Sequence, residues 1–265
     1  MARVGLPFVA TGILAAMVVT GPRAHAIIAT GGSGKYIPNI DWINWGADGD
    51  PVGPGKTATS TLDLAGVALV TTCTMNAVSG SPVAAYVSGD WYEDSMPRLY
   101  DVGQAATALF NETPGEETTF TFSCSATLGG RPYPLKGLVF ADGETTSPAE
   151  FTQTTLPAGA TMRIIEPYRP DGCTFNYYDT VTGSTYRYEG ESGTTSNCED
   201  GNGIDGEPIG INYIEGATTA TIVMHPADGY GHQAIALGAM IPTVDGGDAP
   251  DSYGDAAHIQ NSTWS

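Results

Sequence analysis

The sequence predicts an all-β fold, an antiparallel β-sandwich of jelly-roll type, and three observations support this. The 265 residues include 35 glycines and only 15% charged residues, and threonine is frequent, a composition that favours strands and turns over helices. Apolar, β-branched segments recur along the chain with turn residues between them, which is typical of a sandwich. Several segments also alternate apolar and polar side chains, as strands with one buried face do.

The expected strands are short segments rich in β-branched and aromatic residues. They are Ile40–Trp45, Val67–Met75, Val83–Val87, Ala105–Phe110, Thr118–Thr127, Gly137–Phe140, Met162–Ile165, Thr174–Tyr178, Thr185–Tyr188, Ile209–Ile214, Thr218–Met224 and Gln233–Ile241. In the fifth of these, Phe120, Phe122 and Cys124 fall on one face and hydroxyl residues on the other, which predicts one buried and one solvated side.

The first 26 residues, Met1–Ala26, predict a secretory signal peptide. Arg3 precedes an apolar run, Val4–Val19, which is shorter than the roughly 20 residues that a membrane-spanning helix needs. Small residues at Ala24 and Ala26 form a cleavage site, so we expect cleavage after Ala26. One domain, residues 27–242, and a junction segment, residues 243–265, make up the remainder.

The acidity of the chain limits the classes of partner. Cleavage removes Arg3 and Arg23, so Lys+Arg falls from 10 to 8 against 29 Asp+Glu, a net charge of −21. Such a surface repels nucleic acid and anionic lipid, and no later segment is apolar enough to span a membrane. We therefore expect a secreted, extracellular protein with no nucleic-acid partner and no membrane insertion. Basic partners or divalent cations are favoured, although solubility alone also explains the acidity.

Four cysteines in an exported chain predict two disulfide bonds. We favour Cys73 with Cys124, because both lie in apolar runs that read as neighbouring strands, and Cys173 with Cys198, which bracket one polar loop. The other two pairings stay open. A zinc site is disfavoured because the cysteines have no C-x-x-C spacing.

The strand expected at residues 40–45 is apolar on both faces, since Ile40 and Trp42 share one face and Ile43 and Trp45 the other. Two interpretations follow. Both tryptophans belong to the core, or one ring, here taken as Trp45, lines a ligand groove.

Two further aromatic groups are candidate ligand contacts. Trp91 and Tyr92 lie in an acidic loop, and Tyr178 and Tyr186 flank a hairpin that closes near Gly183 and brings the two tyrosines together. The alternative is that such tyrosine pairs only stabilise the sheet.

No catalytic residue, metal ligand or cofactor is assigned. The glycine-serine runs lack the final glycine of a nucleophile elbow. His225 and His232 flank a turn and could meet there with Asp228, but a pair without a third ligand is weak evidence for a metal. The acidic loop Glu199–Glu207 offers oxygen ligands for Ca²⁺ without the EF-hand spacing, which leaves calcium as a low-ranked candidate and a solvated loop as the alternative.

Two motifs carry a resemblance to a known family. Residues 29–46 read ATGGSGKYIPNIDWINWG and residues 245–258 read DGGDAPDSYGDAAH. The first resembles the opening of the non-repetitive ligand-binding domain of CshA-type fibrillar adhesins of Gram-positive bacteria, and the second is similar to the junction that follows this domain. Such adhesins continue into repeats and a sorting signal, which this sequence does not contain, so anchoring and fibril formation are in doubt.

The resemblance implies a lectin-like β-sandwich that binds an extracellular glycoprotein or glycan and does not catalyse, with a matrix protein such as fibronectin as the implied target. Two other functions stay open. One is an extracellular carbohydrate-active hydrolase, because jelly-roll folds host both lectins and glycosidases. The other is a structural subunit of a surface layer.

Overall fold

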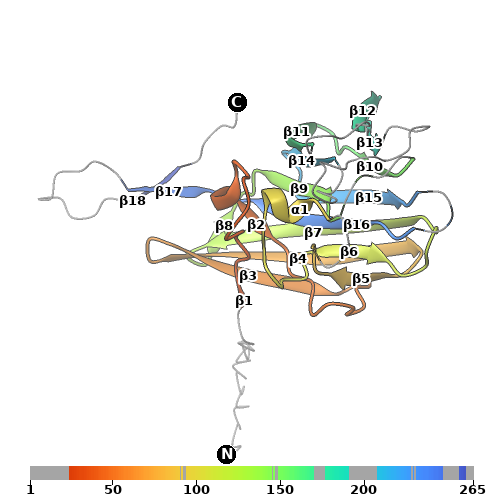
Figure 1. Ribbon diagram of the computed structural model, residues 1–265. Coiled ribbons are helices and arrows are strands. Elements are labelled where there is room, and N and C mark those ends of the chain that lie inside the picture. Colours follow the sequence, from red (N-terminus) through yellow and green to blue (C-terminus); the bar gives the residue numbers. More distant parts are fainter. Residues whose placement is uncertain are drawn as a thin grey trace, which may run out of the picture.

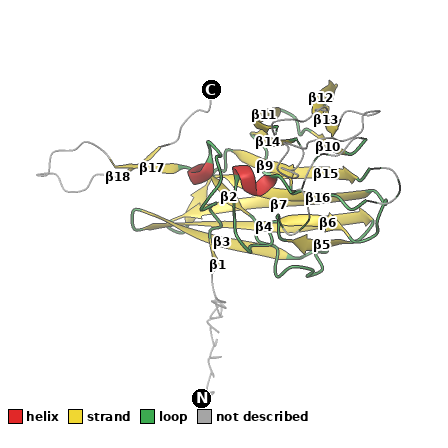
Figure 2. Cartoon of the chain, in the orientation of Figure 1, coloured by secondary structure: helices red, strands yellow, loops and turns green. Residues whose placement is uncertain are grey.

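The computed structural model confirms the all-β sandwich (Figures 1 and 2). It describes residues 24–89, 91, 94–144, 146, 149–169, 177–190, 208–227, 229, 231–246 and 257–260. The paired strands are antiparallel apart from one short parallel pair at the N-terminal end of the described chain. None of the helices in these residues is long and apolar enough to cross a membrane.

The larger sheet forms one layer of the sandwich. Its spatial order is β1 (Ala24–His25), β3 (Thr57–Leu64), β4 (Val67–Gly80), β7 (Thr118–Leu128), β15 (Thr219–His225), β10 (Phe151–Thr155), β13 (Thr185–Gly190) and β12 (Tyr177–Thr182), with β8 (Arg131–Tyr133) beside β7. Inward and outward side chains alternate along most of these strands, because one face meets the core and the other meets water.

The smaller sheet forms the second layer. Its spatial order is β11 (Thr161–Tyr168), β14 (Ile209–Glu215), β9 (Gly137–Asp142), β16 (Ala234–Met240), β6 (Ala108–Asn111) and β5 (Val83–Tyr86), with β2 (Ile40–Trp42) beside β16. Every residue of β9 and β16 is buried. Both faces of this sheet are therefore covered along its two central strands.

The outer cover of the smaller sheet comes from the N-terminal segment and two short helices, η1 (Ile37–Asn39) and α1 (Met96–Leu99), drawn red in Figure 2. A glycine turn joins these parts. Gly32 has φ +92°, and a Cβ there would lie 2.3 Å from the Leu99 carbonyl oxygen, so only glycine fits. Glu166 also holds the outer cover in place, because it accepts hydrogen bonds from the Tyr100 hydroxyl and the Lys35 amide.

Two apolar clusters result, one on each side of the smaller sheet. Ile43 and Trp45 belong to the cluster between the sheets, whereas Ile40 and Trp42 pack beneath the outer cover. The segment thus buries apolar side chains on both sides of the sheet as expected, but its strand is shorter than the predicted residues 40–45 and ends at Trp42. Both tryptophans are core residues, and Trp45, at 1% exposed, does not line a groove.

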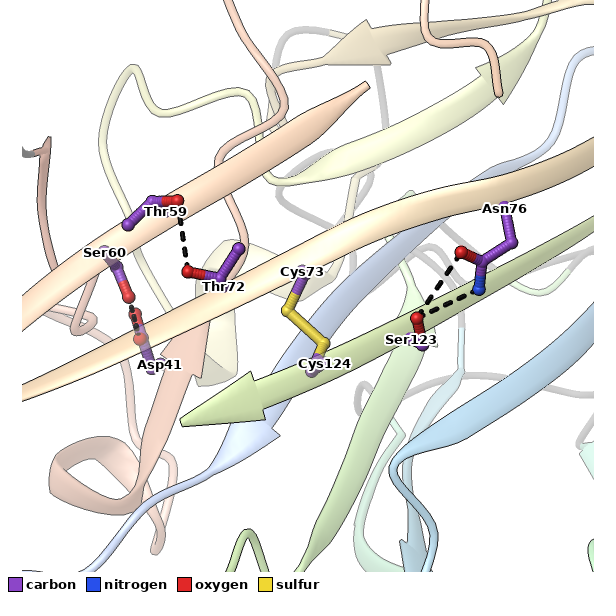
Figure 3. The surroundings of a disulfide bond; sticks show 8 residues. All are labelled: Asp41, Thr59, Ser60, Thr72, Cys73, Asn76, Ser123 and Cys124. Atoms are coloured by element: carbon purple, nitrogen blue, oxygen red, sulfur yellow. Dashed lines mark hydrogen bonds between the residues drawn. A yellow bond between two sulfur atoms is a disulfide. The ribbon is translucent and has the colours of Figure 1, made fainter. Parts of the chain in front are cut away.

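A disulfide joins the two central strands β4 and β7 (Figure 3). Cys73 and Cys124 are directly opposed in the strand register, with Cα atoms 4.1 Å apart, so the expected pairing is confirmed. The Thr59–Thr72 and Asn76–Ser123 hydrogen bonds flank it on the solvent side. Cys173 and Cys198 lie outside the described residues.

In the β12–β13 hairpin, the expectation that Tyr178 and Tyr186 lie together is wrong. It closes at Gly183 and Ser184, as predicted, but its register pairs Val181 with Tyr186 and Tyr178 with Glu189. Tyr178 and Tyr186 are thus three positions apart along the ladder and do not form a cross-strand pair, because the two-residue turn fixes the register.

The remaining strands, β17 (Thr243–Gly246) and β18 (Ala257–Gln260), pair with each other and with no other described strand. Figure 1 shows this hairpin extending away from the sandwich. It follows Ile241, the last residue of the core cluster.

Candidate ligand-binding surface

An aromatic platform, made of Tyr86, Trp91, Phe110 and His232, lies on the outer face of the smaller sheet next to the helical cover. The strand register places Tyr86 on β5 and Phe110 on β6 on the same face. The Trp91 ring lies with its centroid 4.1 Å from that of Tyr86, and it meets Phe110 edge-on at 5.8 Å and His232 at 5.9 Å. Tyr86 is buried, whereas the other three are partly exposed. The platform therefore offers aromatic surface to solvent.

Asp94 fixes the loop that carries Trp91. Its Oδ2 accepts the Tyr86 hydroxyl at 2.5 Å, the Gly89 amide at 2.6 Å and the Trp91 amide at 3.2 Å. Burial, and then the bond to Asp94, raise the pKa of Tyr86 far above its usual range, so its hydroxyl stays a donor. The Tyr86 oxygen in turn accepts the Trp91 amide at 2.8 Å. A ring held in this way loses little conformational freedom when a ligand binds.

Buried acids lie near the Tyr86 side of the platform, where the charge of Glu144 acts on the Tyr86 hydroxyl. Asp142 and Glu150 are each 2% exposed. Glu144 is only partly buried as a whole residue, but protein atoms surround its carboxyl group, which accepts the Ala234 amide at 3.1 Å. Burial, followed by the charges of Glu150, Asp142 and Asp94, raises the pKa of Glu144 well above its usual value. This region thus favours a protonated carboxyl group at Glu144.

A second surface lies on the outer face of the larger sheet, where the β12–β13 hairpin borders a polar hollow of about 360 Å³. The hollow is lined by Gln153, Thr180, Thr182, Thr185, Arg187 and Glu189. The Arg187 guanidinium sits 3.5 Å from the centroid of the Phe151 ring and forms a 2.6 Å ion pair with Glu189. Its charge is already satisfied within the protein.

The ligand-contact residues predicted from the sequence lie in different parts of the fold. Trp91 joins the platform, whereas Trp45 and Tyr186 are buried, each 1% exposed, and offer almost no surface to a ligand. Tyr92 and the Tyr178 side chain lie outside the described residues. No single surface therefore gathers the predicted set.

Sequence reasoning missed the platform partners of Trp91. Phe110 lies in an expected core strand and His232 precedes another, and they are far from Trp91 along the chain. Only the strand pairing of β6 with β5 and β16 brings these segments together. No sequence signal marks that pairing.

The two histidines do not form the pair that the turn suggested. His225 stacks on Phe151 at 4.4 Å and bonds Glu117 at 3.2 Å, whereas His232 bonds the Asn111 carbonyl at 2.6 Å. Each ring is thus held by different neighbours, because the turn separates the ends of β15 and β16. Asp228 and the acidic loop Glu199–Glu207 lie outside the described residues. Within the described ranges, no group of three or more His, Cys, Asp or Glu side chains is arranged to hold a metal ion.

Comparison with protein families shows which family the chain belongs to. The family model for non-repetitive domain 2 of the surface adhesin CshA matches residues 38–241, well over half of the chain. The chain belongs to this family. The match contains every strand from β2 to β16, so both sheets apart from β1, and both candidate surfaces, lie in this CshA-type domain. Membership makes the chain a surface-adhesin domain of a cell-surface or extracellular protein.

The curated proteins give no match. Among solved structures, the N-terminal domain of the Streptococcus gordonii adhesin Sgo0707 is similar with a TM-score of 0.39 and 7% identity, covering 76% of this chain and 51% of that chain. This chain thus spans about half the length of that structure.

Proposed function

We propose that this CshA-type domain is secreted, binds an extracellular glycoprotein or glycan, and uses the aromatic platform around Trp91 as its contact surface. Membership in a surface-adhesin family supports the class of function. Residues 27–242 form the binding domain in this proposal, and the domain carries no catalytic role.

One observation carries the choice of surface. Trp91 is a large, partly exposed aromatic ring fixed by a buried tyrosine and a carboxylate. Tryptophan and tyrosine are enriched at binding hot spots because they combine a large apolar area with a polar edge.

The polar hollow on the larger sheet is the competing surface. Its one cation, Arg187, is paired with Glu189 and stacked on Phe151, so an anionic ligand would have to displace an existing ion pair. Its other lining groups are mainly threonines and a glutamine. We therefore rank it below the platform.

A binding assay with matched variants on the two faces tests the proposal. The protein beginning at Ile27 is applied to immobilised matrix glycoproteins, fibronectin included, and to glycans. We expect saturable binding to one class, at least a tenfold rise in Kd for Trp91→Ala, and a smaller rise for Trp91→Phe. Thr182→Arg, which fills the hollow on the opposite face, serves as the matched control and should bind normally.

The opposite result for the two variants would assign the binding site to the hollow on the larger sheet. If Thr182→Arg abolishes binding while Trp91→Ala binds like wild type, the hollow is the contact surface and our assignment is wrong. Repeating the assay with calcium or a chelator tests the acidic loop Glu199–Glu207 as a calcium ligand. Degradation of a glycan on the array would favour the hydrolase alternative, and concentration-dependent assembly without binding would favour a surface-layer subunit.

A further inference from the structure

The start of the expected mature chain is firmly held in the fold. The Ile27 carbonyl accepts the Trp42 amide at 2.9 Å, and the Ile27 side chain packs against the apolar cluster under the outer cover. The Ile27 amide nitrogen lies 3.1 Å from Oδ1 of Asp41. Immediately before it, the Ala26 amide donates to the Thr61 carbonyl at 3.0 Å.

Asp41 is a buried carboxylate, and none of the described residues that line the space beside it is a lysine or an arginine. It is 3% exposed, and its second oxygen accepts the Ser60 hydroxyl, as Figure 3 shows. A cavity of about 20 Å³ beside it is lined by Ile27, Ser60 and Thr71 among others, and among the described lining residues His25 is the only other titratable group. No lysine, arginine or second carboxylate among the described residues lines the cavity.

Such a carboxylate is costly in the uncleaved chain. Burial raises the pKa of Asp41 to about 6, against the opposing effect of hydrogen bonds from Ser60, Ile27 and Thr71. A buried charge needs a countercharge as well as hydrogen bonds. His25 is exposed and belongs to the predicted signal peptide, so it leaves on cleavage.

We propose that cleavage between Ala26 and Ile27 creates that countercharge, and that the new Ile27 ammonium forms a buried ion pair with Asp41 that locks the N-terminus of the mature domain. Hydrolysis of the Ala26–Ile27 peptide bond consumes one water, leaves a carboxylate on Ala26, and leaves an amine on Ile27 that takes up a proton. The amide nitrogen already lies at hydrogen-bond distance from Oδ1, so the pair forms without moving the fold. The proposal rests on cleavage after Ala26 and not on the identity of the ligand.

The reactivity of the N-terminal amine provides a direct test. Two proteins are prepared from fusions whose removal leaves no extra residue, one starting at Ile27 and one at Ala26. An ammonium paired with a buried carboxylate has a raised pKa, and each unit of pKa lowers the free amine tenfold. We expect the Ile27 amine to react with an acylating reagent at pH 8 at least about tenfold more slowly than the Ala26 amine, measured by mass spectrometry. Equal rates would overturn the proposal.

A double-mutant cycle provides the second readout. Asp41→Asn is combined with each N-terminus, and thermal unfolding is measured for the four proteins at pH 7. In the wild-type background, the protein that starts at Ala26 should have a lower Tm than the protein that starts at Ile27. In the Asp41→Asn background, this difference in Tm should be smaller by several degrees. The cycle cancels the separate contribution of the Ala26–Thr61 hydrogen bond. If the two differences are equal, there is no coupling between the N-terminus and Asp41, and the ion pair does not exist.

The cleavage site is measured separately. Mass spectrometry of the full chain after export from a bacterial host should give a mature N-terminus at Ile27. Cleavage elsewhere overturns the proposal for the natural protein and leaves the ligand-binding proposal untouched. The amine-reactivity comparison needs no substitution, so it remains decisive even if Asp41→Asn does not fold.

Discussion

At the scale of single residues, Glu144 shows how a buried carboxyl group makes stability depend on pH. Its pKa is raised above the ordinary value of 4.5 by burial and by neighbouring acids. As pH rises from about 4.5, the unfolded carboxyl group loses its proton before the folded one, so the free energy of unfolding falls until the folded pKa is passed. Glu144→Gln removes this loss, and its amide oxygen can still accept the Ala234 amide.

We therefore expect the free energy of unfolding of Glu144→Gln to equal that of wild type near pH 4 and to exceed it by at least about 1 kcal/mol at pH 8. Denaturant unfolding at a series of pH values measures this. The exposed Glu116 provides the matched control, since Glu116→Gln should change stability little at any pH. A constant difference between Glu144→Gln and wild type across the series would contradict the argument.

At the scale of elements, the β4–β7 pair joins both halves of the larger sheet and carries the Cys73–Cys124 bond. The sequence separation of these cysteines is 51, and closing a loop of that length restricts the unfolded chain by about 4 kcal/mol in the chain-entropy model. Replacing both cysteines by alanine should lower the free energy of unfolding by about that amount. Urea titration checks it, with reduced wild type as the control. A loss well below 1 kcal/mol would mean that the strand ladder alone fixes this pair.

Strands whose buried side is apolar could be predicted from the sequence, and strands whose buried side is polar could not. Phe120 and Phe122 in β7 gave a clear alternation, and that strand was found. In β10 the buried residues are Thr152 and Thr154, which are satisfied by hydrogen bonds to Gln233 and to the Thr221 carbonyl, so no apolar period marks the strand. β3 was missed for a different reason: Ala58, Leu62 and Leu64 face the core, but hydroxyl residues occupy four of its eight positions and obscure the apolar alternation.

The candidate site was less predictable than the fold. Trp91 stood out as an aromatic residue in an acidic loop, but its exposure depends on Phe110 and His232, which strand pairing brings beside it. The hairpin tyrosine Tyr186 looked equally suitable, and its burial against the smaller sheet is decided by the way the two sheets stack. Local sequence does not encode either outcome.

At the scale of the whole molecule, the boundary of the folding unit is set by the end of the core. Met240 and Ile241 are each 1% exposed and belong to the two apolar clusters, and the Ile241 amide donates to the Asn39 carbonyl. The hairpin of β17 and β18 pairs only with itself among the described strands. Stability follows the apolar area buried, so the residues after 242 should contribute little.

A protein of residues 27–242 should therefore unfold within about 2 °C of the protein of residues 27–265, as measured by calorimetry, and bind the same ligand. The matched control ends at Ala239, three residues earlier. It loses Met240 and Ile241 from the two clusters, and each such loss typically costs about 2 to 5 kcal/mol, which lowers Tm by many degrees. If the 27–242 protein is itself strongly destabilised, the terminal hairpin contributes to the fold, and the domain boundary lies beyond the core strands.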